Sequence, residues 1–241
     1  MTRWSIYIVT DMARTKSAPE SREAKRILIV EAAIGVFASK GYHATKMQDI
    51  ADELSIAKGT LYEYYIDKED LFLAVYDHWM TKYEQSMMRA FEDHFDPVTK
   101  ADALIDTTVE FYEIHAKYAP LLLEFWAHSL RSTSDSFLIR IREMKTRLSQ
   151  LGAEVTKQMQ TLKLFREVDS ESFAVLELGI SDGIFLQWVI DGQSYSLREA
   201  YKFRQSVIGS GLMTDTLRSL VATKVQKKLQ QGFLHTSFTR K

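Results

Sequence analysis

The chain has 241 residues, no cysteine, three prolines, ten glycines and a formal net charge of −1. The lack of cysteine excludes disulfides and Cys-ligated metals, and the near-zero net charge gives no overall sign of a nucleic-acid or membrane partner. A chain of this length can bury a substantial core, and its scarcity of proline and glycine predicts long helices with few turns.

The N-terminus carries the apolar patch WSIYIV, which is too short for a signal sequence or a membrane span. No other run is expected to reach membrane length, so the sequence favours a soluble cytoplasmic protein. Residues 1–20 are expected to form a disordered or flexible tail. Met12 is a candidate alternative start, because the patterned sequence begins after it.

Apolar side chains recur at helical spacing after this tail and predict a helix that ends at Gly41. They are Ile27, Val30, Ile34, Phe37 and Ala38. Thr45 is expected to cap the following helix at 47–54, with Gln48 as its capping-box partner. A tight turn at 55–57 leads to a short helix at 58–65, and these segments together predict a helix-turn-helix.

The two short helices have an apolar seam and a polar outer face. The seam residues are Ile50, Ala51, Leu54, Ile56 and Leu61. At about 100° per residue, the second helix directs Leu61 and Tyr65 inward. Its outward residues are Gly59, Tyr62 and Glu63, flanked by Lys58 and Thr60. A small, hydroxylated and charged face suits the major groove of DNA, although a helix pair of this spacing can also be a plain αα-hairpin.

Helical patterns continue to the C-terminus. Asp67 is expected to cap a helix at 68–92, Asp96 and Pro97 to start the next, and Ser196 and Glu199 to form a capping box. Further helices are expected at 98–117, 119–130, 135–163, 171–191 and 197–230. No strand pattern of useful length and no internal repeat are found. The predicted fold is all-α, with a small N-terminal helical unit followed by a larger bundle.

Several polar residues near the predicted helix-turn-helix are candidate phosphate contacts. Tyr62 and Tyr64 offer hydroxyl groups, and Lys68 lies at the start of the next predicted helix, where charge and free N–H groups favour a phosphate. The Thr45 end of the preceding helix offers the same chemistry with Lys46. Residues 1–70 nevertheless hold ten Lys or Arg against eleven Asp or Glu, so local placement must supply the attraction. Arg22, Lys25 and Arg26 are a candidate arm near the DNA backbone.

The segment ATKMQDIADELSIAKGTLYEYYIDKEDLFLAVY resembles the DNA-binding region of the TetR family of bacterial transcriptional regulators. The resemblance runs from about Ile27 to Tyr76, and its most specific part is KGTLYEYYIDKEDL. It implies base or phosphate contacts by Thr45, Lys46, Gln48, Lys58, Gly59, Thr60, Tyr62, Tyr64 and Lys68. Ser55 stands where the family usually has glycine, so a positive φ there implies strain. Tyr65 stands where phenylalanine is usual.

Enzymatic signatures are missing from the sequence. None of the six histidines follows a glutamate by three positions, and there is no HExxH motif and no nucleophile elbow. Glu124 and His128 are four positions apart on one predicted helix, which favours a structural pair. We therefore expect no enzyme, no metal and no cofactor. A purely structural or interaction module remains a rival interpretation.

The C-terminal half is rich in aromatic residues. Most must form the core, and a subset with a few polar groups is typical of a small-molecule site. The candidate ligand-binding residues are Phe111, His115, Phe125, Trp126, His128, Phe137, Asp182 and Phe185. The resemblance implies an effector that binds there, shifts the spacing of two DNA-reading heads and releases DNA. The aromatic content favours an apolar or aromatic effector.

The segment 171–191 is apolar on more than one face, which suits either a fully buried helix or a helix shared with a second copy of the chain. Gly179 and Gly183 would allow close helix approach. The resemblance implies dimerisation through 171–191 and 197–230. The candidate interface residues are Gly179, Gly183, Ile184 and Trp188.

The sequence as a whole predicts a homodimeric, ligand-responsive repressor that binds a double-stranded DNA operator and no membrane. A regulator of the same fold without a small-molecule effector is the alternative. The predicted divisions are a tail at 1–20, a DNA-binding domain with its connecting helix at 21–92, and a ligand-binding and dimerisation domain at 93–241.

Overall fold

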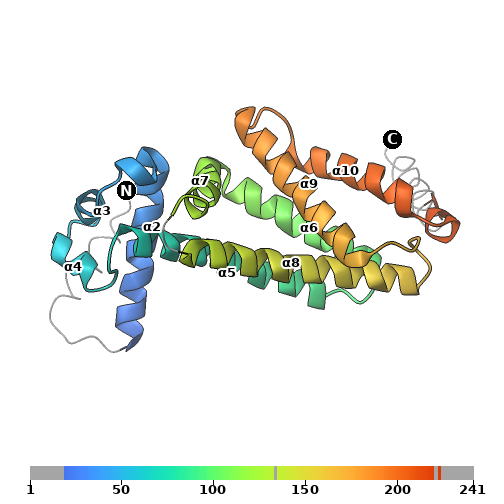
Figure 1. Cartoon of the computed structure of the whole chain (residues 1–241), viewed down its shortest axis with the longest axis horizontal. Helices are drawn as coiled ribbons and strands as arrows, with labels where there is room; N and C mark the ends of the chain where they lie inside the picture. Colours follow the sequence, from blue (N-terminus) through green and yellow to red (C-terminus); the bar gives the residue numbers. More distant parts are fainter. Residues whose placement is uncertain (1–18, 133–134, 220–221, 224–241) are drawn as a thin grey trace, which may run out of the picture. The chain divides into compact units, whose positions relative to one another are not determined.

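The computed structural model describes residues 19–132, 135–219 and 222–223, and these residues are predominantly helical (Figure 1). The all-α prediction is confirmed. Among the described residues the only strand-like feature is an isolated bridge between Phe165 and Met213. The chain separates into two compact units, Met1–Trp79 and Met80–Lys241, which are described one at a time.

Within its described residues, the first unit holds three helices and the beginning of a fourth. They are α2 (Pro19–Ala44), α3 (Met47–Glu53), α4 (Lys58–Tyr62) and the start of α5 (Lys68–Glu92), which continues into the second unit. Phe37 of α2 lies edge-on to Phe72 of α5, with ring centroids 4.9 Å apart. Both rings are fully buried, so burial of apolar surface from α2 and α5 supplies much of this small core.

The junction of α2 and α3 differs from the predicted capping. Helical geometry breaks at Gly41 as predicted, because this glycine has φ 76° and ψ 161°. The Thr45 and Gln48 capping box is wrong, and Lys46 is the N-cap residue. The Thr45 hydroxyl donates to the carbonyl of Gly41 at 2.7 Å, and the Asp49 carboxylate accepts the Lys46 backbone N–H at 2.7 Å. Lys40 and that N–H together lower the pKa of Asp49.

The second unit is a helical bundle. Its helices after α5 are α6 (Pro97–Ile114), the 3-10 turn η1 (Ala116–Tyr118), α7 (Ala119–Ser129), α8 (Ser136–Thr161), α9 (Ser170–Ile190) and α10 (Leu197–Leu212). α8 packs along α9 and α6, while α10 packs on α6 and α9 (Figure 1). In this unit the predicted N-cap residues Asp96 and Ser196 are confirmed, since Asp96 accepts the N–H of Thr99 and Ser196 accepts the N–H of Glu199. The returning bond from the Glu199 side chain that a capping box requires is not among the described hydrogen bonds.

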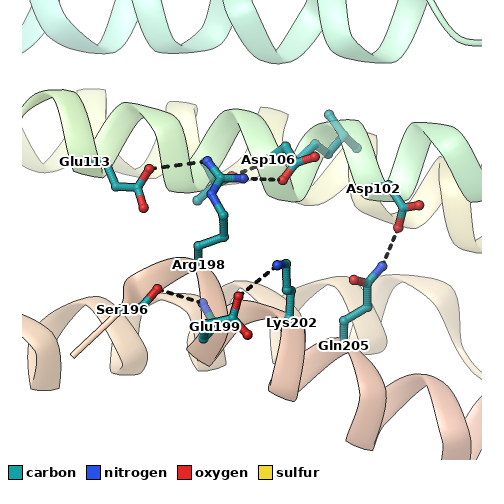
Figure 2. A network of polar contacts seen from close by, with 10 residues as sticks. Asp102, Asp106, Glu113, Ser196, Arg198, Glu199, Lys202 and Gln205 are labelled. Atoms are coloured by element: carbon teal, nitrogen blue, oxygen red, sulfur yellow. Dashed lines mark hydrogen bonds and ion pairs between the residues drawn. The ribbon is translucent and has the colours of Figure 1, made fainter. Parts of the chain in front are cut away.

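Charged and amide side chains join α10 to α6 (Figure 2). Arg198 lies between two carboxylates of α6 and donates to Asp106 at 2.7 Å and to Glu113 at 3.3 Å. One helical turn or more away, Gln205 donates to Asp102. Because these groups are exposed, each contact adds little stability, but together they fix the register of α10 along α6.

The last predicted helix is shorter than expected. The helix predicted at 197–230 ends at Leu212, because the chain there bonds to the α8–α9 connection. The N–H of Arg166 donates to the carbonyl of Leu212 at 2.9 Å, and the N–H of Thr214 donates to the carbonyl of Leu164 at 2.9 Å. A second helical segment follows at 215–219, and residues 220–221 and 224–230 of the expected helix lie outside the described residues.

In the part of the chain that the structure describes, two helices are long and apolar enough to cross a membrane by length and composition, namely Arg22–Ala44 and Ser170–Ile190. The expectation that no run reaches membrane length was wrong by this measure. Only 17% of the apolar window in α9 is buried within this chain. α9 therefore presents apolar surface that its own chain leaves uncovered.

Candidate functional site

α3 and α4 form the predicted helix-turn-helix. Ile50, Ala51 and Leu61 are fully buried between the helices, and the N–H of Ile56 closes the turn on the carbonyl of Ala51 at 3.0 Å. Tyr65 is only 2% exposed, so the inward direction predicted for Leu61 and Tyr65 is confirmed. The apolar seam thus fixes which face of α4 remains outside.

The turn contains a residue in a strained backbone conformation. Ser55 has φ 54°, the left-handed region that glycine adopts freely and other residues enter at a cost. The sequence placed Ser55 where the TetR family usually has glycine. The expected strain is therefore present in this turn.

The outer face of α4 is open. Lys58 and Gly59 are exposed, and Tyr62 is 47% exposed, with the Lys58 ammonium 5.6 Å from the centre of its ring. A Cβ placed on Gly59 would have no atom within 4 Å, so packing inside the chain does not require glycine at this position. A helical glycine without a packing reason suits a position where another molecule approaches closely.

The other candidate DNA contacts differ in accessibility. Lys46 and Gln48 are exposed, and Gln48 donates to Asp52 at 2.7 Å. Thr45 is only 1% exposed. The Lys68 ammonium donates to the carbonyls of Tyr42 at 2.6 Å, Thr45 at 2.9 Å and His43 at 3.3 Å. Lys68 therefore caps the end of α2, and a phosphate contact by this residue stays a prediction.

The candidate ligand-binding residues lie in two aromatic clusters. In the first, Phe185 of α9 stacks on Tyr112 of α6 with ring centroids 4.1 Å apart and lies edge-on to Trp126 at 6.3 Å. Phe111 contacts the ring of His115 at 4.6 Å. This cluster joins α6, α7 and α9 around buried aromatic surface.

The second cluster holds the remaining aromatic candidates. Phe137 lies 6.1 Å from Phe125 and 5.0 Å from the His128 ring, and both phenylalanines are fully buried. The carboxylate of Asp182, the remaining candidate, forms an ion pair with Lys145 at 2.8 Å. Whether any of these residues binds a ligand stays a prediction.

Three tyrosines of the bundle are not among the candidate ligand-binding residues given above. The Tyr83 hydroxyl bonds to Thr108 at 2.9 Å, and burial raises its pKa to about 12. The Tyr201 hydroxyl donates to the carbonyl of Ser181 at 3.2 Å. Tyr112 is half-buried, and desolvation raises its pKa well above the usual value. The sequence shows each of these tyrosines as a hydroxyl on the apolar face of a predicted helix. It does not show that they belong to one part of the bundle, because they lie on three different helices, α5, α6 and α10.

A buried ion pair joins α9 and α10. Arg204 is 8% exposed, pairs with Glu177 at 2.9 Å and donates to the Ser181 hydroxyl at 2.6 Å. One carboxylate oxygen of Glu177 and Nε of Arg204 have no hydrogen-bond partner among the described residues. Burial raises the pKa of Glu177, and the nearby guanidinium opposes this rise.

The candidate dimer residues lie on different sides of α9. Gly179 and Gly183 are exposed, and a Cβ on either would have no atom within 4 Å. Ile184 is half-buried. Trp188 is buried in its own chain, where its Nε1–H donates to the carbonyl of Tyr195 at 3.1 Å. Within the described ranges no group of three or more histidine, aspartate or glutamate side chains could hold a metal ion.

The helix-turn-helix region matches the family model described as bacterial regulatory proteins, tetR family, over residues 29–75. This match identifies the helix-turn-helix as one of the tetR-family type. Residues 29–75 therefore form a helix-turn-helix region of the kind found in bacterial transcriptional regulators. The matched residues include the buried seam of α3 and α4 and the open face of α4.

Relatives extend the similarity beyond this region. The chain is 25% identical over 179 residues to the fatty acid metabolism regulator protein of Bacillus subtilis, covering 74% of this chain and 90% of the relative. It is also similar to the transcriptional regulator FadR from B. subtilis solved in complex with stearoyl-CoA, with a TM-score of 0.67, 21% identity and coverage of 77% and 98%. A regulator from Saccharomonospora viridis solved with choline has a TM-score of 0.72, 18% identity and coverage of 80% and 99%. At these identities the solved structures establish the fold.

Proposed function

We propose that the chain is a homodimeric repressor that acts in the cytoplasm, binds its operator through α4 and leaves it when a small effector binds in the second unit. The observation that carries this proposal is the open outer face of α4 within the family-matched helix-turn-helix. Lys58, Gly59, Thr60 and Tyr62 form this face and would enter the major groove. Close approach at Gly59 would allow the neighbouring hydroxyl and ammonium groups to reach base edges and phosphates.

The dimer would form through uncovered apolar surface on α9 and α10. Large apolar side chains exposed there are Val175, Leu176, Leu186 and Ile190 on α9, and Phe203 and Val207 on α10. On α9 they recur at helical spacing with Gly179 and Gly183, so they form one stripe. Apolar surface of this kind is typical of a protein–protein interface, and the two open glycines would let a partner helix approach closely.

The effector would bind beside the stacked Tyr112 and Phe185 rings. Tyr112 places a half-buried hydroxyl beside the Phe185 ring, where a ligand with a polar group beside an apolar portion would find both a hydrogen-bond partner and aromatic surface. The related structures carry two chemistries, the acyl thioester stearoyl-CoA and the quaternary ammonium choline. An effector lowers DNA affinity only if it binds the DNA-free conformation more tightly than the DNA-bound one.

Selection of duplexes from a random-sequence pool by the wild-type protein tests the DNA-binding part of this proposal. We expect a two-fold symmetric site with half-sites one or more helical turns apart, as two-fold dimers require. Selection of no specific duplex would contradict the proposed function. The same selected duplex, labelled for anisotropy, then serves as the probe for release.

Stearoyl-CoA and choline, added separately, test the effector. We expect one of them to change tryptophan emission, since Trp126 and Trp188 both lie near Phe185, and to release the duplex over the same concentration range. The Tyr112→Phe variant should require more of that compound while binding the free duplex normally. A compound that changes emission and leaves DNA affinity unchanged would instead favour a regulator without an effector switch.

A further inference from the structure

α4 needs support from outside itself. It has only five residues, and a helix this short has no appreciable stability alone. The backbone N–H groups of Tyr64 and Tyr65 both bond back to the carbonyl of Leu61 at 3.0 Å. Glu63 and Tyr64 follow the end of α4. No later residue of α4 can donate an N–H to their carbonyls, so these carbonyls need donors from elsewhere.

Two arginines of α2 supply those donors. Arg22 donates to the carbonyl of Glu63 at 3.2 Å, and Arg26 donates to the carbonyl of Tyr64 at 2.8 Å. The two arginines are four positions apart, so they lie on the same face of α2. A guanidinium at the C-terminal end of a helix is also favoured by the helix dipole.

Arg26 makes additional contacts that Arg22 does not share. Its guanidinium carbon lies 4.6 Å from the centre of the Tyr65 ring. The Tyr65 hydroxyl donates in return to the backbone carbonyl of Arg26 at 3.3 Å. Side chain and backbone of Arg26 therefore both engage the two residues that follow α4. The tyrosine at position 65, where the TetR family usually has phenylalanine, supplies one of these bonds.

We infer that Arg26 is a positioning residue that fixes the orientation of α4 by capping the Tyr64 carbonyl and stacking on the Tyr65 ring. This inference rests on the proposed function in one respect, namely that the oriented face of α4 reads DNA. Arg26 itself acts through α4 and need not contact the DNA. Its guanidinium is directed to the Tyr64 carbonyl and the Tyr65 ring.

Lys25 provides a matched control. It lies next to Arg26 on α2, carries the same charge and is 5.7 Å from the centre of the Tyr64 ring. The described hydrogen bonds of the protein include none from its ammonium. Lys25→Met therefore removes an adjacent positive charge without removing a cap from α4.

Amide hydrogen exchange in the free protein tests the structural step without DNA. Loss of a hydrogen bond from a charged donor should let α4 open at least about tenfold more often, so the Tyr64 and Tyr65 amides of Arg26→Met should exchange at least about tenfold faster. Lys25→Met should leave them unchanged. Tyr65→Phe retains the ring and removes only the returning bond, so it should accelerate the same amides by a smaller factor. Unchanged exchange in both Arg26→Met and Tyr65→Phe would overturn the inference.

Affinity for the selected duplex over a series of salt concentrations tests the functional step. Arg26→Met should weaken binding about tenfold or more while leaving the slope of log affinity against log salt unchanged, because no phosphate contact is lost. Arg26→Lys should remain impaired, since an ammonium keeps the charge but lacks the planar group that stacks on Tyr65. A slope reduced by about 0.9 with normal amide exchange would show a direct phosphate contact instead.

The exchange and affinity measurements together distinguish failure of this inference from failure of the proposed function. If the wild-type protein selects no duplex, the proposed function fails, and hydrogen exchange still decides whether Arg26 holds α4. If Arg26→Met does not fold, amide exchange in Tyr65→Phe tests the inference instead, because this variant removes only the hydroxyl that bonds to the Arg26 carbonyl. Normal duplex affinity in a variant with accelerated exchange would overturn the positioning role.

Discussion

Replacing Lys68 with methionine tests the most unexpected bonding in the helix-turn-helix unit. The Lys68 ammonium donates to three backbone carbonyls, at 2.6 Å, 2.9 Å and 3.3 Å, where α2 ends. It also lies 4.3 Å from the centre of the Tyr42 ring. Methionine retains an apolar side chain of similar length and removes every donor.

The expected cost follows from these contacts. Hydrogen bonds from charged donors contribute about 1.5–3 kcal/mol each in favourable cases, and a cation over an aromatic ring adds about 0.5–1 kcal/mol at exposed sites. Lys68 is half-buried, so water replaces part of what is lost. We expect Lys68→Met to lower the free energy of unfolding by about 2–3 kcal/mol, because the carbonyls at the end of α2 lose their donor. The melting temperature should fall by about 5–10 °C.

Thermal unfolding followed by circular dichroism measures this effect, with Lys58→Met as the control. Lys58 carries the same charge in the same unit but is exposed on α4. The control should melt close to the wild-type temperature and bind DNA more weakly. If Lys68→Met melts like the control, the three carbonyl bonds do not stabilise the unit, and the sequence-based assignment of Lys68 to a phosphate is favoured.

Three further predictions follow from the same kind of argument. Ser55→Gly should raise the free energy of unfolding by about 1 kcal/mol in denaturant titration, since glycine relieves the positive φ; a loss of stability would contradict the strain. Asp96→Ala should cost about 1 kcal/mol at pH 7 by removing the cap of α6. Because the bonds from Thr99 lower the pKa of Asp96 below 3.8, this difference should persist above that pH and vanish as pH falls through the lowered pKa; a difference that does not depend on pH would exclude the carboxylate as its source. Gly183→Leu should give monomers in sedimentation at unchanged helicity, because a side chain there meets nothing in its own chain; an intact dimer would place the interface elsewhere.

Local features of the fold were predictable from sequence because neighbouring residues determine them. The spacing of Leu61 and Tyr65 indicates which face of α4 is buried, and Asp96 before Pro97 marks the start of α6. The prediction that Thr45 caps α3 was wrong because the Thr45 hydroxyl donates to the carbonyl of Gly41. From the sequence alone, a threonine between two helices can either donate its hydroxyl to a carbonyl of the preceding helix or accept an N–H of the following one.

Features that depend on residues distant in sequence were not predictable. α10 ends at Leu212 because the chain there bonds to the connection after α8. Lys68 reaches back more than twenty positions to the end of α2, and Arg26 reaches forward 38 positions to Tyr64. Tyr112 gains its position in the bundle from the ring of Phe185 on another helix. Periodicity within one helix carries no information about such partners.

Duplex binding by the Gly59→Leu variant tests most directly whether the open face of α4 reads DNA. No atom of the chain lies within 4 Å of a Cβ at this position, so leucine should be accommodated with the fold and melting temperature retained or slightly improved. The bulky side chain should keep α4 out of the groove and weaken binding to the selected duplex by about a hundredfold or more, the equivalent of losing one or two good base contacts. Wild-type affinity in the folded Gly59→Leu protein would contradict the proposal that α4 enters the groove.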